Sequence, residues 1–248
     1  METMPSPAFN EKTFDRFAYL TGTAPAARMT VRGTLDRATI LFALASVTAV
    51  LSWVVVSANP MLALPAALGG GILAFVVGLV TSFNPTAAAY LAPLYAATEG
   101  VFLGAVSLVF ESRYPGIAMQ AVLGTGVVTG VMFVLYRFRV IRATPMFTKT
   151  VLGLTMAVAV MYLIAFGMRM FGHAMPYLND ATPVGIGISL FLIGLAAMNL
   201  IIDFDVIERG EREGRPKAFE WYAAFGLLVT VAWLYIEVLR LLSKLNRR

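Results

Sequence analysis

The chain has 248 residues, of which 59% are hydrophobic and only 13% are charged. A soluble domain carries about a quarter charged residues, so the composition excludes an ordinary soluble protein and indicates a polytopic membrane protein. Cys is absent, His173 is the single histidine and the net charge is +5, which excludes disulfides, thiolate chemistry and a multi-histidine metal cluster within one chain.

The first 37 residues are polar and contain Pro5, Pro7 and Pro25. They lack the apolar core of a cleavable signal peptide. We interpret residues 1–37 as a polar N-terminal tail and residues 38–248 as the membrane domain.

Seven apolar runs follow, and a helix needs about 20 such residues to cross a bilayer. The predicted spans are residues 38–57, 61–83, 87–110, 117–136, 148–171, 184–206 and 221–242. Pro- and Gly-containing turns separate most of them, so neighbouring helices should be antiparallel. The runs are continuously apolar rather than alternating, which excludes a β-barrel and predicts an all-α bundle of seven transmembrane helices.

Three connecting segments hold most of the basic residues, and all three lie on one side if every run crosses. Cytoplasmic loops are enriched in Lys and Arg, so the N-terminus is predicted to be cytoplasmic. The compact loops favour a bacterial cytoplasmic (inner) membrane. The C-terminal bases disagree, because seven spans would place Arg240, Lys244, Arg247 and Arg248 outside. The alternative is a seventh run that re-enters the cytoplasm.

Two acids lie in the last two apolar runs, and an intramembrane carboxylate is expensive enough to suggest a functional site. Asp203 shares a helix face with Asn199, four residues earlier, and Glu237 shares one with Arg240. The simpler alternatives are an interfacial Asp203 paired with a loop arginine and a local Glu237–Arg240 pair.

Other acids are weaker candidates. Glu99 lies inside the third run with no neighbouring base, and Asp205 follows Asp203 but faces elsewhere. The serines within the spans lack a Gly-x-Ser-x-Gly context, and lone helical serines usually bond a backbone carbonyl. The sequence therefore predicts no enzyme and no cofactor, and nothing in it favours nucleic acid as a partner.

Three segments resemble the transmembrane Bax-inhibitor-motif family, in its bacterial branch. Thr98-Glu99-Gly100-Val-Phe-Leu103-Gly104 is similar to that family's Gly-x-x-Leu-Gly segment. Leu200-Ile-Ile-Asp203-Phe-Asp205 and Leu234-Tyr235-Ile236-Glu237 are similar to the family's Tyr-Asp and Leu-Tyr-Leu-Asp segments, which places Asp203 and Glu237 at the family's two acids.

The resemblance implies a seven-helix bundle with the last helix central. It also implies a pH-sensitive Ca²⁺ or proton-coupled leak in which Asp203 and Glu237 form the gate and can contact Ca²⁺ as the transported ion. Two carboxylates in contact cannot both ionise cheaply, so their protonation can switch the hydrogen bonds between two helices.

The chain departs from the family pattern at Glu237, where the family has Asp, and at Arg240, where it has Asn. The spacing also matters, because the turn material at 210–216 comes before the midpoint between Asp203 and Glu237. At about 1.5 Å per residue, an early turn places Glu237 well beyond Asp203 unless part of 210–222 is looped out. Glu220 is then an alternative partner.

Two function classes follow. The first is a pH-sensitive calcium (cation) leak channel or exchanger with Glu99 along its path. The second is a non-conducting regulatory protein that binds a membrane protease or another integral partner, a class that deletion of residues 1–30 would distinguish. A solute transporter and an intramembrane hydrolase are less favoured, since neither repeats nor catalytic motifs are present.

Overall fold

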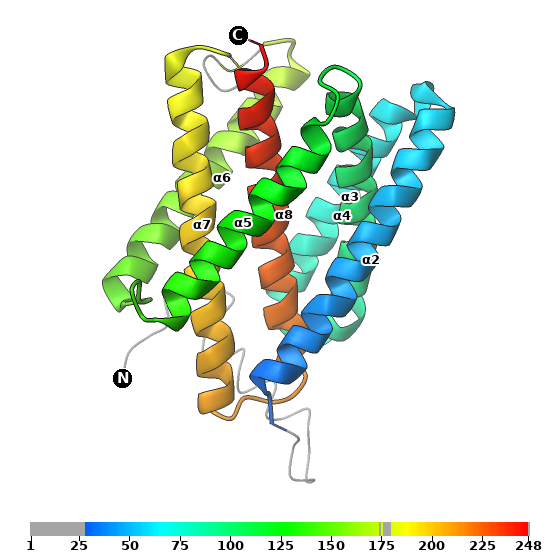
Figure 1. Cartoon of the computed structure of the whole chain (residues 1–248). Coiled ribbons are helices and arrows are strands. Elements are labelled where there is room, and N and C mark those ends of the chain that lie inside the picture. The colour runs from blue at the N-terminus through cyan, green and yellow to red at the C-terminus, as the bar shows by residue number, and fades with distance from the viewer. Residues whose placement is uncertain (1–27, 174, 176–179, 248) are drawn as a thin grey trace. The chain divides into compact units, whose positions relative to one another are not determined.

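The computed structural model describes residues 28–173, 175 and 180–247. In these residues it consists of α-helices and two short 3-10 turns (Figure 1). The helices are α2 (Val31–Ala58), α3 (Ala63–Phe83), α4 (Ala88–Glu111), α5 (Ile117–Arg137), α6 (Pro145–Met170), α7 (Pro183–Arg212) and α8 (Phe219–Leu245). The turns η2 (Pro60–Leu62) and η3 (Pro85–Ala87) begin at the prolines of the two Asn-Pro sequences.

Seven segments in the described residues are long and apolar enough to cross a membrane, which confirms the predicted all-α class and the number of spans. The helices extend beyond the apolar runs. Thr30 caps α2, its Oγ1 accepting a hydrogen bond from Gly33 N at 2.9 Å. That helix therefore begins seven residues before the predicted start, inside the segment that we assigned to the polar tail.

The chain divides into two compact units. The first comprises Met1–Val109 with Asp203–Ala232, and the second comprises Phe110–Ile202 with Trp233–Arg248. Helices α7 and α8 each contribute one part to both units. They are also the two most buried spans, with 56% of the apolar window of each buried.

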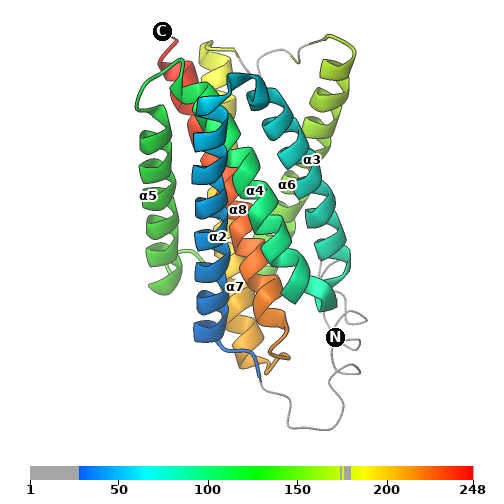
Figure 2. The ribbon, with the colours of Figure 1, turned by 90° about the vertical axis from the view of Figure 1, so that its right-hand side faces the viewer.

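In the first unit, α2 and α3 are joined by η2, and α4 packs against both of them (Figure 2). Ser52 of α2 donates a hydrogen bond to Val101 O of α4 at 2.8 Å. Tyr95 of α4 packs edge-on against Phe225 of α8, with ring centroids 5.0 Å apart. This unit therefore carries Glu99, Asp203 and Glu220 around the beginning of α8.

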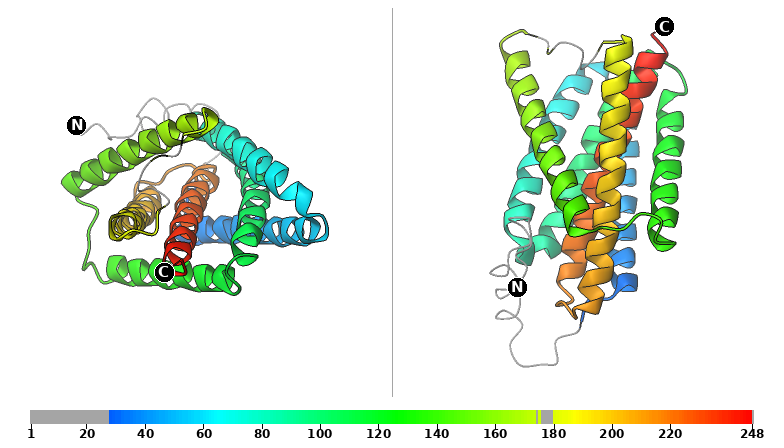
Figure 3. Two further views of the ribbon diagram at one scale, coloured as in Figure 1. Left: turned by 90° about the horizontal axis from the view of Figure 1, so that it is seen from above. Right: turned by 90° about the vertical axis from the view of Figure 1, so that its left-hand side faces the viewer.

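In the second unit, the first half of α6 approaches α7 and the two helices then diverge (Figure 3). Asn199 Nδ2 of α7 donates to Thr155 Oγ1 of α6 at 2.8 Å and to Leu195 O at 2.9 Å. Asn199, a candidate from the sequence, therefore joins α7 to α6.

Small residues allow α2 and α4 to approach closely. A Cβ added at Gly100 would lie 1.9 Å from Thr48 Oγ1 and 2.2 Å from Ala45 O. We expect Gly100→Ala to lower stability by about 1–3 kcal/mol, because the backbone of α2 would have to shift. The measurement is the fraction of monodisperse protein in detergent after heating through a temperature series.

Gly126→Ala in α5 is the matched control, since a Cβ there meets nothing within 4 Å. Alanine should stabilise that helix by about 0.5–1 kcal/mol. Equal thermal profiles for the two variants would show that the close contact at Gly100 does not limit stability.

Candidate functional site

Among the described residues, one carboxylate oxygen of Asp203 lacks a partner. The residue is half-buried, and its Oδ2 atom is buried with no hydrogen-bond partner among the described residues. Thr230 of α8 is the hydrogen-bonding neighbour of the same carboxylate, and its hydroxyl also donates to Gly226 O at 3.2 Å. Gly226, one turn earlier on α8, lies beside it, since a Cβ there would be 3.9 Å from Oδ1. Asp203 is therefore held against α8 with half of its hydrogen-bonding capacity unused.

The contact of Asp203 with Gly226 and Thr230 follows from the position of the turn. Helix α7 ends at Arg212 and α8 begins at Phe219, as the turn material at 210–216 indicated. Antiparallel helices around that turn bring residues near 228 to the depth of Asp203. Glu237 lies seven residues, or about 10 Å of helix rise, beyond Thr230 on α8.

Glu99 is a second buried acid of the first unit, with 9% of the residue exposed. Tyr95, one turn earlier on α4, is its hydrogen-bonding neighbour. Tyr95 packs on Phe225, so the neighbour of Glu99 contacts the stretch of α8 that begins one residue before Gly226, the residue beside Asp203. The sequence singled out both acids but gave no reason to place them near one segment.

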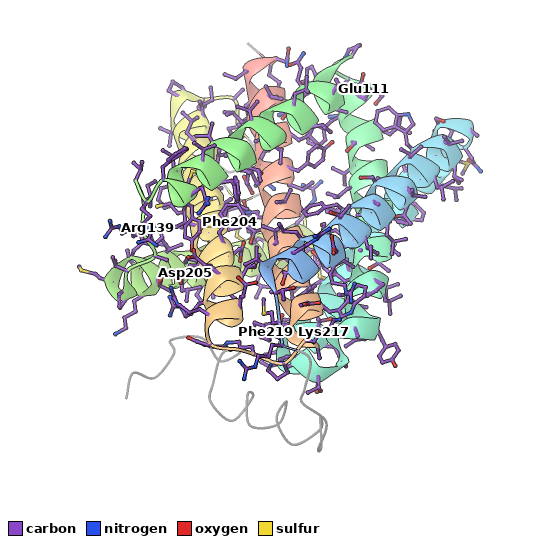
Figure 4. The ribbon with its side chains drawn as sticks, turned by 60° about the horizontal axis from the view of Figure 1, so that its bottom comes forward. Glu111, Arg139, Phe204, Asp205, Lys217 and Phe219 are labelled. Atoms are coloured by element: carbon purple, nitrogen blue, oxygen red, sulfur yellow. The ribbon has the colours of Figure 1, made fainter. Side chains whose placement is uncertain are left out.

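Asp205 forms an ion pair within α7, accepting from Arg209 one turn later. Figure 4 shows it on the same helix as Phe204, above the connection between α7 and α8. The carboxylate is thus neutralised locally, as expected for an acid near a helix end. Its predicted place in a cation pathway is not supported by any contact with Asp203.

Glu220 is held by α2. Its Oε1 accepts from Thr30 N at 3.2 Å and from Thr30 Oγ1 at 3.3 Å, and the residue is only 1% exposed. Thr230, rather than Glu220, is the hydrogen-bonding neighbour of Asp203. Glu220, which the sequence offered as an alternative partner of Asp203, contacts the start of α2 instead.

In the second unit, Glu237 is fully buried and has three hydrogen-bond donors. Arg240 Nη1 lies 3.1 Å from Oε1 and 3.2 Å from Oε2, and Trp233 Nε1 donates to Oε1 at 3.3 Å. The Tyr162 hydroxyl of α6 donates to the same oxygen and accepts from Arg240 Nη1 at 2.7 Å. The local Glu237–Arg240 pair anticipated from the spacing is thus present, inside a larger cluster.

Tyr162 was not a candidate in the sequence, because it lies 75 residues from Glu237. A single tyrosine within an apolar run does not reveal its partner. The available signal was physical: a buried Glu–Arg pair needs further hydrogen bonds to stay inside a membrane protein. That requirement predicts a hydroxyl-bearing side chain from a neighbouring span beside the pair.

Lys244 is one of the four C-terminal bases that the predicted seven spans would place outside the cytoplasm. It is 1% exposed, and its Nζ donates to Gly185 O at 2.7 Å and to Ser189 Oγ at 2.8 Å on α7. Arg240 is paired with Glu237. Arg247 Nε also donates to Tyr114 Oη at 3.2 Å. Three of the four C-terminal bases are therefore engaged by protein groups, and the charge of Arg240 is balanced by Glu237.

The two predicted gating acids have different partners, Thr230 for Asp203 and the Tyr162–Arg240 pair for Glu237. Their coupling stays a prediction. In the described residues there is no group of three or more His, Asp or Glu side chains that could hold a metal ion.

A comparison with protein-family models matches residues 6–247 to the family described as Bax inhibitor 1 like. No curated protein and no solved structure matched the chain. The match covers nearly the whole sequence and includes all seven membrane-spanning helices. The chain is therefore an integral membrane protein that belongs to the Bax inhibitor 1 like family.

Proposed function

We propose that this protein is a pH-sensitive leak pathway or exchanger for Ca²⁺ or another cation in the bacterial cytoplasmic membrane, with its N-terminus in the cytoplasm. Asp203 and Glu237 are its gating acids. The observation that supports it best is the buried Oδ2 of Asp203, which has no partner among the described residues. The proposal assigns no catalytic chemistry and no resident cofactor.

An ionised carboxylate inside a membrane helix must be balanced by water, a cation or a basic side chain. The described surroundings of Asp203 supply one threonine and no base. The neutral acid leaves Oδ2 unpaired but carries no charge, whereas the charged form must draw in water or a cation. Ionisation of Asp203 is therefore the step that admits ions, and the leak should rise with pH.

Glu99 of α4 would supply a second oxygen ligand in the first unit. It is buried with Tyr95 and has no neighbouring base in sequence. Carboxylate and hydroxyl oxygens suit a hard cation such as Ca²⁺. A cation that passes Asp203 would thus meet another acid within the first unit.

Glu237 plays a different part in this proposal. Arg240 and Tyr162 already satisfy its carboxylate, so it has no free charge to offer a cation. Glu237 becomes available only when Arg240 moves away from it. We therefore assign Asp203 to sensing and Glu237 to a latched position that opens with helix movement.

The direct test is Ca²⁺ entry into liposomes that contain the purified protein and an internal calcium dye. We expect a flux above protein-free liposomes that increases as the external pH is raised stepwise through the range in which the protein is stable. Liposomes with reconstituted, correctly folded protein and no flux at any pH would exclude the leak. A flux of constant size across that range would exclude gating by a buried acid.

The closed set of donors around Glu237 favours the second function, a regulatory protein that binds an integral partner without conducting ions. The N-terminal tail would then provide the contact. A deletion should stop at residue 27, because Thr30 caps α2 and holds Glu220. Loss of the cellular phenotype in the deletion variant, with unchanged thermal stability and no flux in liposomes, would favour this function.

A further inference from the structure

A polar pocket of about 280 Å³ lies in the first unit, where the start of α2 meets the connection between α7 and α8. Four bases and two acids line it, namely Arg28, Arg32, Arg37, Lys217, Asp36 and Glu220. Figure 4 shows Lys217 at the end of the first unit, beside Phe219 at the beginning of α8. The pocket is smaller than a typical drug-sized site, which begins at about 300 Å³.

The backbone fixes this end of the unit. Arg28 and Pro216 form an isolated antiparallel bridge, and Met29 N donates to Arg215 O at 2.7 Å. A Cβ at Gly33 would lie 2.2 Å from Glu220 Oε1, so only glycine permits the acid to approach α2 so closely. The pocket is therefore formed by ordered backbone.

Glu220 is the second observation that indicates a ligand. Its Oε1 is satisfied by Thr30, but its Oε2 is buried and has no hydrogen-bond partner among the described residues. Arg37 Nη2 forms an ion pair with Oε2 at 3.9 Å, but this distance is too long for a hydrogen bond. A buried carboxylate oxygen in a pocket wall calls for a donor, and an ammonium group is the donor that also matches its charge.

The basic residues that line the rest of the pocket favour an anionic ligand. Arg28, Arg32 and Lys217 are exposed residues that line the same pocket, and Arg side chains recognise phosphate oxygens in a fixed geometry. Two backbone N–H groups in the first turn of α2 are already bonded, Gly33 N to Thr30 Oγ1 and Val31 N to Glu211 Oε1. The anion contacts must therefore come from the basic side chains.

We propose that this pocket binds the head group of an aminophospholipid. The primary ammonium donates to Glu220 Oε2, and the phosphate lies among Arg28, Arg32 and Lys217. The position fits such a ligand, because the membrane-spanning segment of α2 begins at Val31 and basic pockets at the membrane surface bind lipid head groups. This site is separate from the acids of the leak pathway and does not depend on ion flux.

The chemistry distinguishes three lipids that share a phosphate. Phosphatidylethanolamine has a primary ammonium that can donate to Glu220. Phosphatidylcholine has the same charge but no N–H group, and phosphatidylglycerol has no cation. A preference for phosphatidylethanolamine over phosphatidylcholine therefore tests the contact with Glu220. The affinity that all three lipids share tests the contacts of the phosphate with the basic residues.

The test is native mass spectrometry of the full-length protein in detergent, titrated with each lipid. We expect phosphatidylethanolamine to bind about tenfold more tightly than phosphatidylcholine, since a hydrogen bond to a charged group is lost in the latter. Glu220→Gln should remove this preference, whereas Arg32→Gln should weaken the binding of all three lipids. Glu213→Gln, an exposed acid of the same connection that does not line the pocket, should behave as wild type.

Equal binding of phosphatidylethanolamine and phosphatidylcholine to the wild-type protein would overturn the proposal, as would a preference that survives Glu220→Gln. Free phosphoethanolamine that displaces the bound lipid would support recognition of the head group. If free phosphoethanolamine binds but the lipid does not, the ligand is soluble and the lipid assignment is wrong. Should Glu220→Gln fail to fold, Arg32→Gln, at an exposed side chain, still decides whether the pocket is the site.

Discussion

Asp203→Asn should abolish the pH dependence of Ca²⁺ flux and leave it at the low level of the wild type at acidic pH. Asparagine has the shape of the neutral acid and can still contact Thr230, but it cannot ionise. Wild-type flux should rise by up to roughly tenfold per pH unit on the acidic side of the transition and level off above its midpoint, because a single carboxyl group is titrated. The variant should show no such change.

The measurement is the initial rate of dye response in liposomes at several external pH values. Glu208→Gln is the control, since Glu208 is an exposed acid on the same helix and should keep the wild-type profile. A full pH response in Asp203→Asn would assign the sensing group elsewhere, and Glu99→Gln would then be the next variant to compare.

Arg240→Met should destabilise the protein by about 3–5 kcal/mol, the cost of leaving a buried acid without its ion-pair partner. Glu237 would keep Tyr162 and Trp233 as donors but would lose the cation. Tyr162→Phe removes one donor and should cost less, about 1–3 kcal/mol. Thermal unfolding in detergent, followed by the loss of monodisperse protein, measures both effects.

The double variant Arg240→Met/Glu237→Leu separates the ion pair from packing. Removing both charges leaves no isolated charge in the cluster, so stability should recover most of the loss seen in Arg240→Met. If the double variant is less stable than Arg240→Met alone, Glu237 contributes mainly through contacts other than its pair with Arg240.

The sequence was sufficient for the class of fold because the apolar runs are long and continuous. It also predicted the early turn between α7 and α8, since Gly210 to Pro216 is the only turn material between Asp203 and Glu237. The local pair of Glu237 with Arg240 followed from a three-residue spacing on one helix. Each of these features depends on neighbours along the chain.

The sequence did not predict the contacts between helices that lie far apart along the chain. Tyr162 binds Glu237 across 75 residues, and Thr30 binds Glu220 across 190. The pattern of apolar residues within a helix does not indicate which distant residue its polar side chains will contact. The start of α2 was also misjudged, because Val31 to Arg37 contains three charged residues and looks like tail, whereas Thr30 caps the helix and Glu220 anchors it.

The buried cations of α8 have a consequence for how this protein is made. A basic side chain buried near the end of a membrane-spanning helix costs free energy unless protein groups accept its hydrogen bonds, and Arg240 and Lys244 lie in the last two turns of α8. Arg240 and Lys244 find their partners on α6 and α7, both of which are synthesised earlier. The last helix should therefore become stable in the bilayer only after those two are in place, and chains that lack them should expose α8 to membrane quality control.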